Sequence, residues 1–231
     1  MEKIFEETYK IRQFHVDAFG RLKPSALLGL VQDVATSHYD LVNPDLVWVV
    51  SRHHVEITRL PQAEETVRME TWALPPTRAA FPRATVAYGG DGGELFRSIS
   101  LWVLIRRDSR ALVLPGKVDL PMVTTIRGLE LPNPTSLAPR QFDRHTSRRI
   151  RYSLLDVNGH MNNARYLDWV EDLLPLDFHR EKTLREFTVC YLSEGRPEEE
   201  VDIGYSVENG TVRVDGRCGQ ERVFSAQAIY E

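Results

Sequence analysis

The sequence predicts an α+β fold of two tandem domains, each a curved antiparallel sheet wrapped around a long helix. Each half of the chain contains one helical pattern that is followed by several strand patterns and no further helix. The second half also repeats the first, and a proline-rich stretch separates the two. A helix packed across one strongly curved sheet buries the apolar faces of both elements, so it is the simplest arrangement for this order of patterns.

Composition excludes several classes of protein. With 231 residues, 42% of them hydrophobic, the chain can bury one large core or two smaller ones. Its net charge of −4 gives no reason to expect nucleic acid or a membrane surface as a partner. No apolar run approaches the ~20 residues of a membrane span, and the first residues lack the apolar region of a signal peptide. We therefore expect a cytoplasmic protein.

The two cysteines, Cys190 and Cys218, have no CxxC or Cys/His spacing around them. This pattern is typical of reduced thiols and does not indicate a zinc site. We expect neither a metal ion nor an organic cofactor.

The first half reads, in order, as a strand, a helix and four strands. The opening residues predict a strand near 9–16. The helix begins near Pro24, which suits a first turn, and its apolar stripe is formed by Leu27, Leu28, Val31, Val34 and Ala35. Strand patterns then cover residues 47–57, 66–73, 79–88 and 95–105, with a glycine-rich hairpin signal at 89–93.

Residues 116–145 contain several prolines and no clear periodicity, which predicts an extended linker. The linker separates an N-terminal domain, 1–115, from a C-terminal domain, 146–231. In the second domain we expect a strand at 150–155 and a helix from about Tyr166 to Leu174. The later strand patterns cover residues 187–192, 201–207, 211–215 and 223–229, and Asn209-Gly210 predicts a tight hairpin turn.

The two halves align at an offset of 139 residues around the predicted helices, where Asp17 and Gly20 fall on Asp156 and Gly159. Further along the chain the offset is 134, which aligns Val67 with Val201. A repeat of this kind indicates two copies of one structural unit.

The second copy carries a dense polar set just before its helix. Asp156, Asn158 and His160 are spaced so that, in an extended segment, their side chains project the same way. Asn162 or Asn163 can cap the helix that follows, and free N–H groups at a helix start favour developing negative charge. A plain loop with an Asn-rich cap is the simpler alternative, but the whole set favours a functional site.

The two copies differ where chemistry would take place. The first copy has Phe19 and Arg21 in place of Asn158 and His160. At the offset of 134, it has Leu60 where the second copy has Glu194. A cap that served structure alone would need no such difference, so we interpret the first copy as a degenerate site and the second as the catalytic one.

Nearly the whole chain resembles the acyl-acyl carrier protein (acyl-ACP) thioesterases of the bacterial kind, which consist of two fused hot-dog folds. The resemblance rests on Trp48-Val-Val-Ser51, Arg59-Leu60-Pro61, Glu65-Thr66-Val67-Arg68-Met69-Glu70-Thr71-Trp72, the loop Asp156-x-Asn158-x-His160-x-Asn162-Asn163 and Tyr191-x-x-Glu194-Gly195. It implies hydrolysis of fatty acyl-ACP to free fatty acid, with acyl carrier protein and its phosphopantetheine-linked chain as the partner.

By the same resemblance, the catalytic residues are Asp156, Asn158, His160 and Glu194. Plant members have a cysteine directly after the glutamate, whereas this chain has Gly195, so we expect no thiol nucleophile there. We also expect no plastid transit segment.

The residue types suit thioester hydrolysis. Without a serine or cysteine beside a base, water or a carboxylate is the expected attacker. Asn158 and His160 would polarise the thioester carbonyl, a contribution of ~3 kcal/mol per donor. We expect Glu194 to position water, and Asp156 either to orient His160 or to attack; the sequence leaves both roles of Asp156 open.

Three further sets of residues are candidates for binding. The interior of the first domain is free of catalytic groups, so it could hold the acyl chain against Leu27, Leu30, Val31 and Trp48, although each could equally be plain core. Asn162 and Asn163 are expected to contact the substrate. The arginines at 140, 144, 148, 149 and 151 precede the catalytic loop, and we weigh a docking surface for the acidic carrier evenly against an ordinary solvated face. A homodimer is compatible with the sequence.

Three alternatives stay open. An acyl-CoA thioesterase would use the same site. A non-catalytic module that senses acyl thioesters would keep the fold but not the intact polar set. A hydratase is a weaker alternative, since hot-dog hydratases use a related Asp/His loop.

Overall fold

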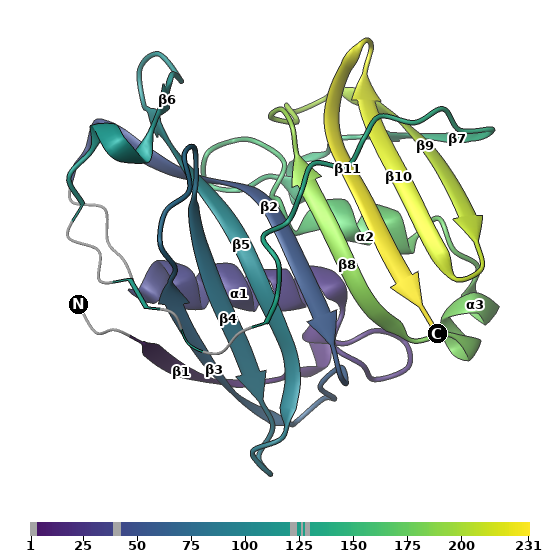
Figure 1. Cartoon of the computed structure of the whole chain (residues 1–231). Helices are drawn as coiled ribbons and strands as arrows, with labels where there is room; N and C mark the ends of the chain where they lie inside the picture. Colours follow the sequence, from purple (N-terminus) through teal and green to yellow (C-terminus); the bar gives the residue numbers. More distant parts are fainter. Residues whose placement is uncertain (1–3, 39–42, 121–123, 126, 128–129) are drawn as a thin grey trace. The chain divides into compact units, whose positions relative to one another are not determined.

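The computed structural model describes residues 4–38, 43–120, 124–125, 127 and 130–231 (Figure 1). The chain divides into two compact units, one ending at Pro134 and the other beginning at Thr135. Within the described residues, no helix is both long and apolar enough to cross a bilayer.

The first unit is an antiparallel sheet that lies across one long helix, α1 (Figure 1). Its strands follow the order β1-β3-β4-β5-β2, and β6 pairs with the end of β5. The elements are β1 (Phe5–Lys10), α1 (Pro24–His38), β2 (Leu46–Ile57), β3 (Thr66–Ala73), β4 (Phe81–Tyr88), β5 (Glu94–Arg106) and β6 (Leu112–Val113). Pro24 begins α1. The N–H groups of a first helical turn have no intrahelical acceptor, so the N–H that proline lacks is not missed there. Apolar residues such as Leu27 and Val31 are fully buried on the helix.

The second unit repeats this plan with a shorter helix. Its strands follow the order β8-β11-β10-β9-β7, all antiparallel. The elements are β7 (Arg144–Arg149), α2 (Arg165–Glu171), α3 (Leu176–Glu181), β8 (Leu184–Tyr191), β9 (Glu200–Glu208), β10 (Thr211–Cys218) and β11 (Glu221–Tyr230). The turn between β9 and β10 is the one predicted, since Asn209 and Gly210 both have positive φ, as a type I′ hairpin turn requires.

Hydrogen bonds confirm the internal repeat. Leu22 N–H donates to the carbonyl of Pro61 at 2.7 Å, and Met161 N–H donates to that of Gly195 at 2.9 Å. These two bonds match at both offsets, 161 − 22 = 139 and 195 − 61 = 134. Each unit therefore ties the loop before its helix to the same later segment.

Two of the predicted strands are wrong, and they are equivalent in the repeat. The chain is a short 3-10 helix at Gln13–His15 and again at Tyr152–Leu154, where we expected strands at 9–16 and 150–155. The strands of these regions, β1 and β7, end before those turns. Exposed aromatic side chains produced the misleading apolar pattern, because Phe14 and Tyr152 are 72% and 90% exposed.

The helix of the second unit ends earlier than expected. We predicted apolar helical spacing as far as Leu174, but α2 ends at Glu171 and α3 begins only at Leu176. Pro175 accounts for this break, because the residue before a proline is disfavoured in the helical region.

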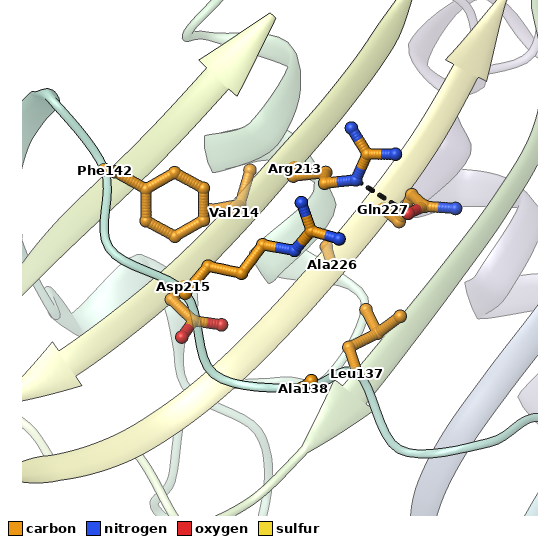
Figure 2. A pocket seen from close by; sticks show the side chains of 9 residues that line it. Leu137, Ala138, Phe142, Arg213, Val214, Asp215, Ala226 and Gln227 are labelled. Atoms are coloured by element: carbon orange, nitrogen blue, oxygen red, sulfur yellow. Dashed lines mark hydrogen bonds between the residues drawn. The ribbon is translucent and has the colours of Figure 1, made fainter.

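The described part of the expected linker packs on both units; residues 121–123, 126 and 128–129 lie outside it. Leu131 joins an apolar cluster of the first unit with Trp72 and Ile99. In the second unit the carbonyl of Leu137 accepts a hydrogen bond from Arg222 at 3.3 Å. Figure 2 shows Leu137 and Ala138 on the segment that crosses the sheet there. The boundaries 116 and 145 stay a prediction.

Candidate functional site

The second unit brings together an imidazole and a carboxylate from segments 34 residues apart, His160 and Glu194. His160 Nε2 lies 3.4 Å from Glu194 Oε2. Their side chains are 32% and 36% exposed, so a substrate can reach both. In such a pair the carboxylate can take a proton from water, and the imidazole can donate a hydrogen bond to an adjacent carbonyl.

Asp156 is hydrogen-bonded within its own loop. Its carboxylate accepts hydrogen bonds from the backbone N–H of Asn158 at 2.8 Å and of His160 at 3.4 Å. The Asn158 amide also donates to it at 3.3 Å. The loop turns at Gly159, whose φ of 76° is easy for glycine alone. Because these donors occupy the Asp156 carboxylate, Asp156 orients the backbone that carries His160.

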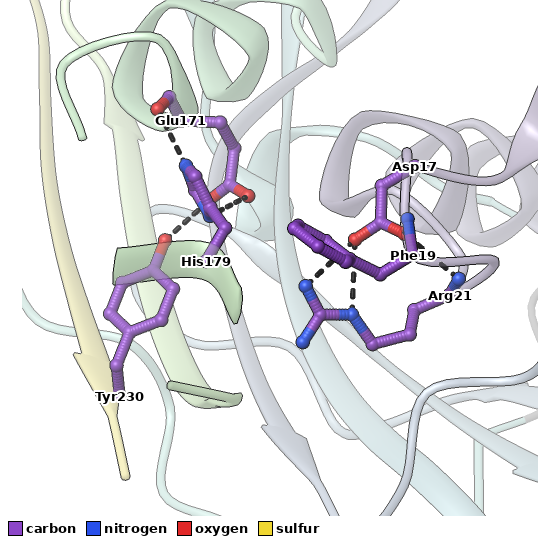
Figure 3. Close-up of polar contacts among 6 residues, drawn as sticks. All are labelled: Asp17, Phe19, Arg21, Glu171, His179 and Tyr230. Carbon is purple, nitrogen blue, oxygen red and sulfur yellow. Dashed lines mark hydrogen bonds and ion pairs between the residues drawn. The ribbon is translucent and has the colours of Figure 1, made fainter. Parts of the chain in front are cut away.

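The first unit has the same loop without the acid–base pair (Figure 3). The Asp17 carboxylate accepts hydrogen bonds from the backbone N–H groups of Phe19 and Arg21 at 2.8 and 2.9 Å. Arg21, which stands where His160 stands in the second unit, closes on Asp17 through Nε at 3.0 Å. The loop geometry thus belongs to the fold, and of the two loops the second alone carries an imidazole at this position.

A side chain at Gly195 would force its neighbours to move. A Cβ there would lie 2.5 Å from the Tyr166 hydroxyl and 2.7 Å from Ile150 Cδ1. The expectation that no thiol follows Glu194 therefore has a steric basis as well. The two cysteines are unpaired; Cys190 is buried and Cys218 half-buried.

The predicted helix cap lies slightly upstream of the helix. Asn162 Oδ1 accepts the N–H of Ala164 at 2.9 Å, but the residue at the cap position is Ala164 itself. Asn163 makes no side-chain hydrogen bond within the described residues. Both asparagines are half-buried just before α2, beside the loop that carries His160.

The expected acyl-chain wall lies in the first unit. Leu27, Leu30 and Val31 are buried on α1. Trp48 is half-buried on β2 and packs edge-on against Phe81, with ring centroids 4.9 Å apart. Trp48 packs in a cluster with Leu46, Phe81 and Leu104. Each of the four expected wall residues also serves as ordinary core.

The first unit also buries a charged group that sequence reasoning missed, Arg83. It is 7% exposed, and its Nη1 lies 2.9 Å from Nδ1 of His38 at the end of α1. Burial lowers its pKa to about 10, and no carboxylate pairs with it among the described residues. An isolated arginine in the apolar strand 81–88 is the signal that could have found it.

The candidate docking arginines do not form one patch. Arg144 and Arg148 lie opposite Tyr205 and Val201 on β9, whereas Arg149 lies opposite Glu200. Since directly opposed residues share a face of a sheet, Arg149 projects to the other side. Arg149 and Arg151 also approach the same carboxylate, that of Glu198, at 3.0 and 3.7 Å.

Arg140 lies elsewhere, in the wall of a small pocket of the second unit. Its wall includes Arg213, which donates to Gln227 at 3.1 Å, and Asp215, which pairs with Arg222 at 2.7 Å. None of the four candidate catalytic residues lines this pocket. Across the described residues, no three His, Cys, Asp or Glu side chains converge as metal ligands would.

Two family models match the chain. One, described as the acyl-ACP thioesterase N-terminal domain, matches residues 2–114, and one described as the acyl-ACP thioesterase C-terminal domain matches residues 138–222.

Curated relatives include the palmitoyl-acyl carrier protein thioesterase of Cuphea hookeriana. It is 24% identical over 222 residues, which cover 83% of this chain and 52% of the plant protein. Oleoyl-acyl carrier protein thioesterase 1 of Arabidopsis thaliana is also 24% identical, over 93% of this chain and 66% of that protein. The chain spans about half the length of the first of these relatives.

Solved structures agree with the fold. An acyl-ACP thioesterase from Bacteroides thetaiotaomicron matches 99% of this chain and 98% of its own, with a TM-score of 0.87 and 25% identity. The 12:0-ACP thioesterase from Umbellularia californica matches 100% of this chain and 98% of its own, with a TM-score of 0.82. Because the Umbellularia protein is only 22% identical to this chain, its similarity shows the fold alone. The predicted fold of two hot-dog domains is thereby confirmed.

Proposed function

The chain belongs to the acyl-ACP thioesterase family, and on that basis we propose that it hydrolyses the thioester of fatty acyl-acyl carrier protein. The products are free fatty acid and carrier protein with its free phosphopantetheine thiol. The observation that carries the proposal is the half-exposed His160–Glu194 pair, which lies in the copy where His160 replaces the Asp17-bound Arg21.

In the proposed reaction, Glu194 takes a proton from water as the water oxygen attacks the thioester carbonyl. His160 and Asn158 stabilise the oxyanion, a term of ~3 kcal/mol per well-placed donor. The C–S bond then breaks, and the proton on Glu194 passes to the departing thiolate. The hydrogen bonds on Asp156 support a loop-orienting role for it and argue against attack by its carboxylate.

A thiol-release assay across acyl-ACPs of graded chain length, with matched acyl-CoAs, tests the proposal. We expect release of one thiol per fatty acid and a higher kcat/KM for the carrier-linked substrates. A preference for acyl-CoA would favour the acyl-CoA thioesterase instead. Binding without thiol release would indicate a sensor, and gain or loss of water without thiol release a hydratase.

We also propose that the acyl chain lies in the interior of the first unit. Trp48→Ala, which removes a half-buried wall residue, should shift the preferred acyl chain towards longer lengths. Each further buried CH₂ is worth about 0.8 kcal/mol, or about fourfold in kcat/KM. The chain-length profile of kcat/KM measures the shift.

Leu174→Ala in the second unit is the matched control for this change, because it also empties a buried site. The division of roles between the units would be given up if Leu174→Ala moved the profile and Trp48→Ala did not.

A cytoplasmic location and a homodimer stay predictions.

A further inference from the structure

Buried polar side chains gather on one face of the sheet in the first unit. Strand pairing sets Thr71 opposite Thr85 and Thr85 opposite Ser98, and directly opposed residues share a face of a sheet. The next row on this face is formed in the same way through Arg83, two residues from Thr85. The six residues, which we call the polar layer, are His53, Thr71, Arg83, Thr85, Ser98 and Ser100, and none is more than 7% exposed.

The polar layer faces α1. Arg83 Nη1 donates to Nδ1 of His38, the last residue of α1, at 2.9 Å and to Thr71 Oγ1 at 3.3 Å. Thr85 Oγ1 donates to Thr71 Oγ1 at 3.1 Å. Because a guanidinium can only donate, Nδ1 of His38 accepts, and a histidine that accepts through one ring nitrogen is neutral. These bonds hold the Arg83 side chain in place but do not offset its charge.

The second unit builds the same fold without a polar layer. Its residues at the matching positions in the strand pairing are apolar, apart from Tyr205 in place of Thr71. Phe187, Val212, Val214, Ala226 and Ala228 take the places of His53, Arg83, Thr85, Ser98 and Ser100. Each of these five apolar residues is at most 2% exposed. Packing a sheet of this kind on its helix therefore does not account for the polar layer.

Two members of the polar layer lack the partners that buried groups normally have. Burial lowers the pKa of Arg83 to about 10, so this side chain is charged at neutral pH, and no carboxylate near it counters the effect. The Ser98 hydroxyl, which is fully buried, has no hydrogen-bond partner within the part of the chain that the structure describes. Burying such groups unpaired costs free energy, and groups of this kind are frequent at functional sites.

We propose that the polar layer is a binding site for a carboxylate on a fatty chain, and that Arg83 is the residue that recognises it. The bonds to His38 and Thr71 use only Nη1 of Arg83, and a guanidinium has further N–H groups in a planar fork that matches a carboxylate. A carboxylate also offsets the buried positive charge, which a hydroxyl or a ketone does not.

Two ligands carry this chemistry. One is a free fatty acid, and the other is an acyl chain with a second carboxylate at its far end, bound in the first unit as proposed above. Only the second of these rests on the proposed hydrolase function. The binding site itself is tested without turnover.

Calorimetry with decanoate and decanol tests the site, because these two ligands share one chain length and differ in charge. We expect the wild-type protein to bind decanoate about tenfold more tightly than decanol, since charge-assisted hydrogen bonds are the strong ones. Arg83→Met removes the charge at similar length and should abolish this preference. Arg97→Met is the matched control: Arg97 lies on the other face of β5, pairs with Glu94 at 2.7 Å, and its loss should leave the preference unchanged.

Thermal unfolding separates a binding role of Arg83 from a structural one. Arg83→Met should keep or raise Tm, because an apolar side chain in place of an unpaired buried charge removes a desolvation cost. A large fall in Tm would count against the site and indicate that Arg83 supports the fold. In that case Arg83→Lys still tests recognition, because it keeps the charge but loses the planar fork, so decanoate should bind less tightly than to the wild type.

Hydrolysis assays then identify the source of the carboxylate. If it is the far end of the acyl chain, kcat/KM for an ω-carboxyacyl-ACP should exceed that for the methyl-ended acyl-ACP of equal length, and Arg83→Met should reverse this order. If it is a free fatty acid, decanoate should inhibit the wild-type protein more strongly than Arg83→Met, with no preference for the ω-carboxyacyl substrate.

A preference for decanoate that is equal in the wild type and in Arg83→Met would overturn the proposal, because the carboxylate would then bind elsewhere, for example at His160. The same holds for a wild-type protein that does not prefer decanoate to decanol. If the protein releases no thiol but its decanoate preference depends on Arg83, the carboxylate site stands and the hydrolase function falls.

Discussion

Glu194→Gln is expected to lower kcat for acyl-ACP by about 10³-fold, since a general base contributes about 10²–10⁴-fold. Glutamine has the volume of glutamate and can still accept a hydrogen bond from His160, but it cannot take the proton of the attacking water. His160→Ala should have a similar effect, because it removes the partner 3.4 Å from that carboxylate. Steady-state hydrolysis of acyl-ACP measures both losses, with Tm as the check that each variant is folded.

Cys190→Ala is the control for this prediction. Cys190 is fully buried and has no role in the proposed reaction, so most of the activity should stay. Loss of hydrolysis in a folded Cys190→Ala protein would contradict a mechanism without a thiol. Near-normal turnover by Glu194→Gln would remove Glu194 from the role of base.

Arg144→Ala/Arg148→Ala should lower kcat/KM for acyl-ACP by about tenfold at low salt and flatten its salt dependence. We propose this pair as the docking residues for the acidic carrier, because neither has a carboxylate partner among the described residues and the two share one face of β7. Charge complementarity of this kind acts mainly on the association rate. Stopped-flow association at several salt concentrations measures the effect.

Arg149→Ala/Arg151→Ala is the matched control, since it removes the same number of charges. The charges of this pair are already offset by Glu198, so we expect a smaller loss. Hydrolysis of a short acyl-pantetheine, which lacks the carrier protein, should be unaffected by Arg144→Ala/Arg148→Ala. An equal loss on acyl-pantetheine and on acyl-ACP would refute the docking role and point to a role in the fold.

Local patterns predicted most of the fold. Residues 66–73 form a strand with the expected bounds, β3, where Val67 and Met69 begin the alternation that is typical of a strand. The pattern failed at 9–16 and 150–155, where exposed aromatic side chains resemble the inward-facing residues of a strand. Periodicity records which residues are apolar, and it does not record which of them meet solvent.

The candidate site divides in the same way. The spacing of Asp156, Asn158 and His160 indicated a functional loop, and comparison of the two copies singled out the second half. The hydrogen bonds to Asp156 could not be predicted, because they depend on the turn of its loop. The separation of Arg148 from Arg149 could not be predicted either, because it depends on the pairing of β7 with β9. Arg83 escaped notice because a single charge in an apolar strand does not show which side of the sheet it faces.

The sequence by itself determined that two related units are present and that only one carries the Asn158, His160 and Glu194 side chains, because residue identity and repeat spacing are written directly in the chain. Only the tertiary structure decided what those residues do to one another. It brought Glu194 to 3.4 Å from His160, bonded Asp156 to its own loop and packed the Tyr166 and Ile150 side chains close to Gly195. Distances between segments far apart in the chain follow from how sheet and helix pack, and packing depends on all the buried side chains together.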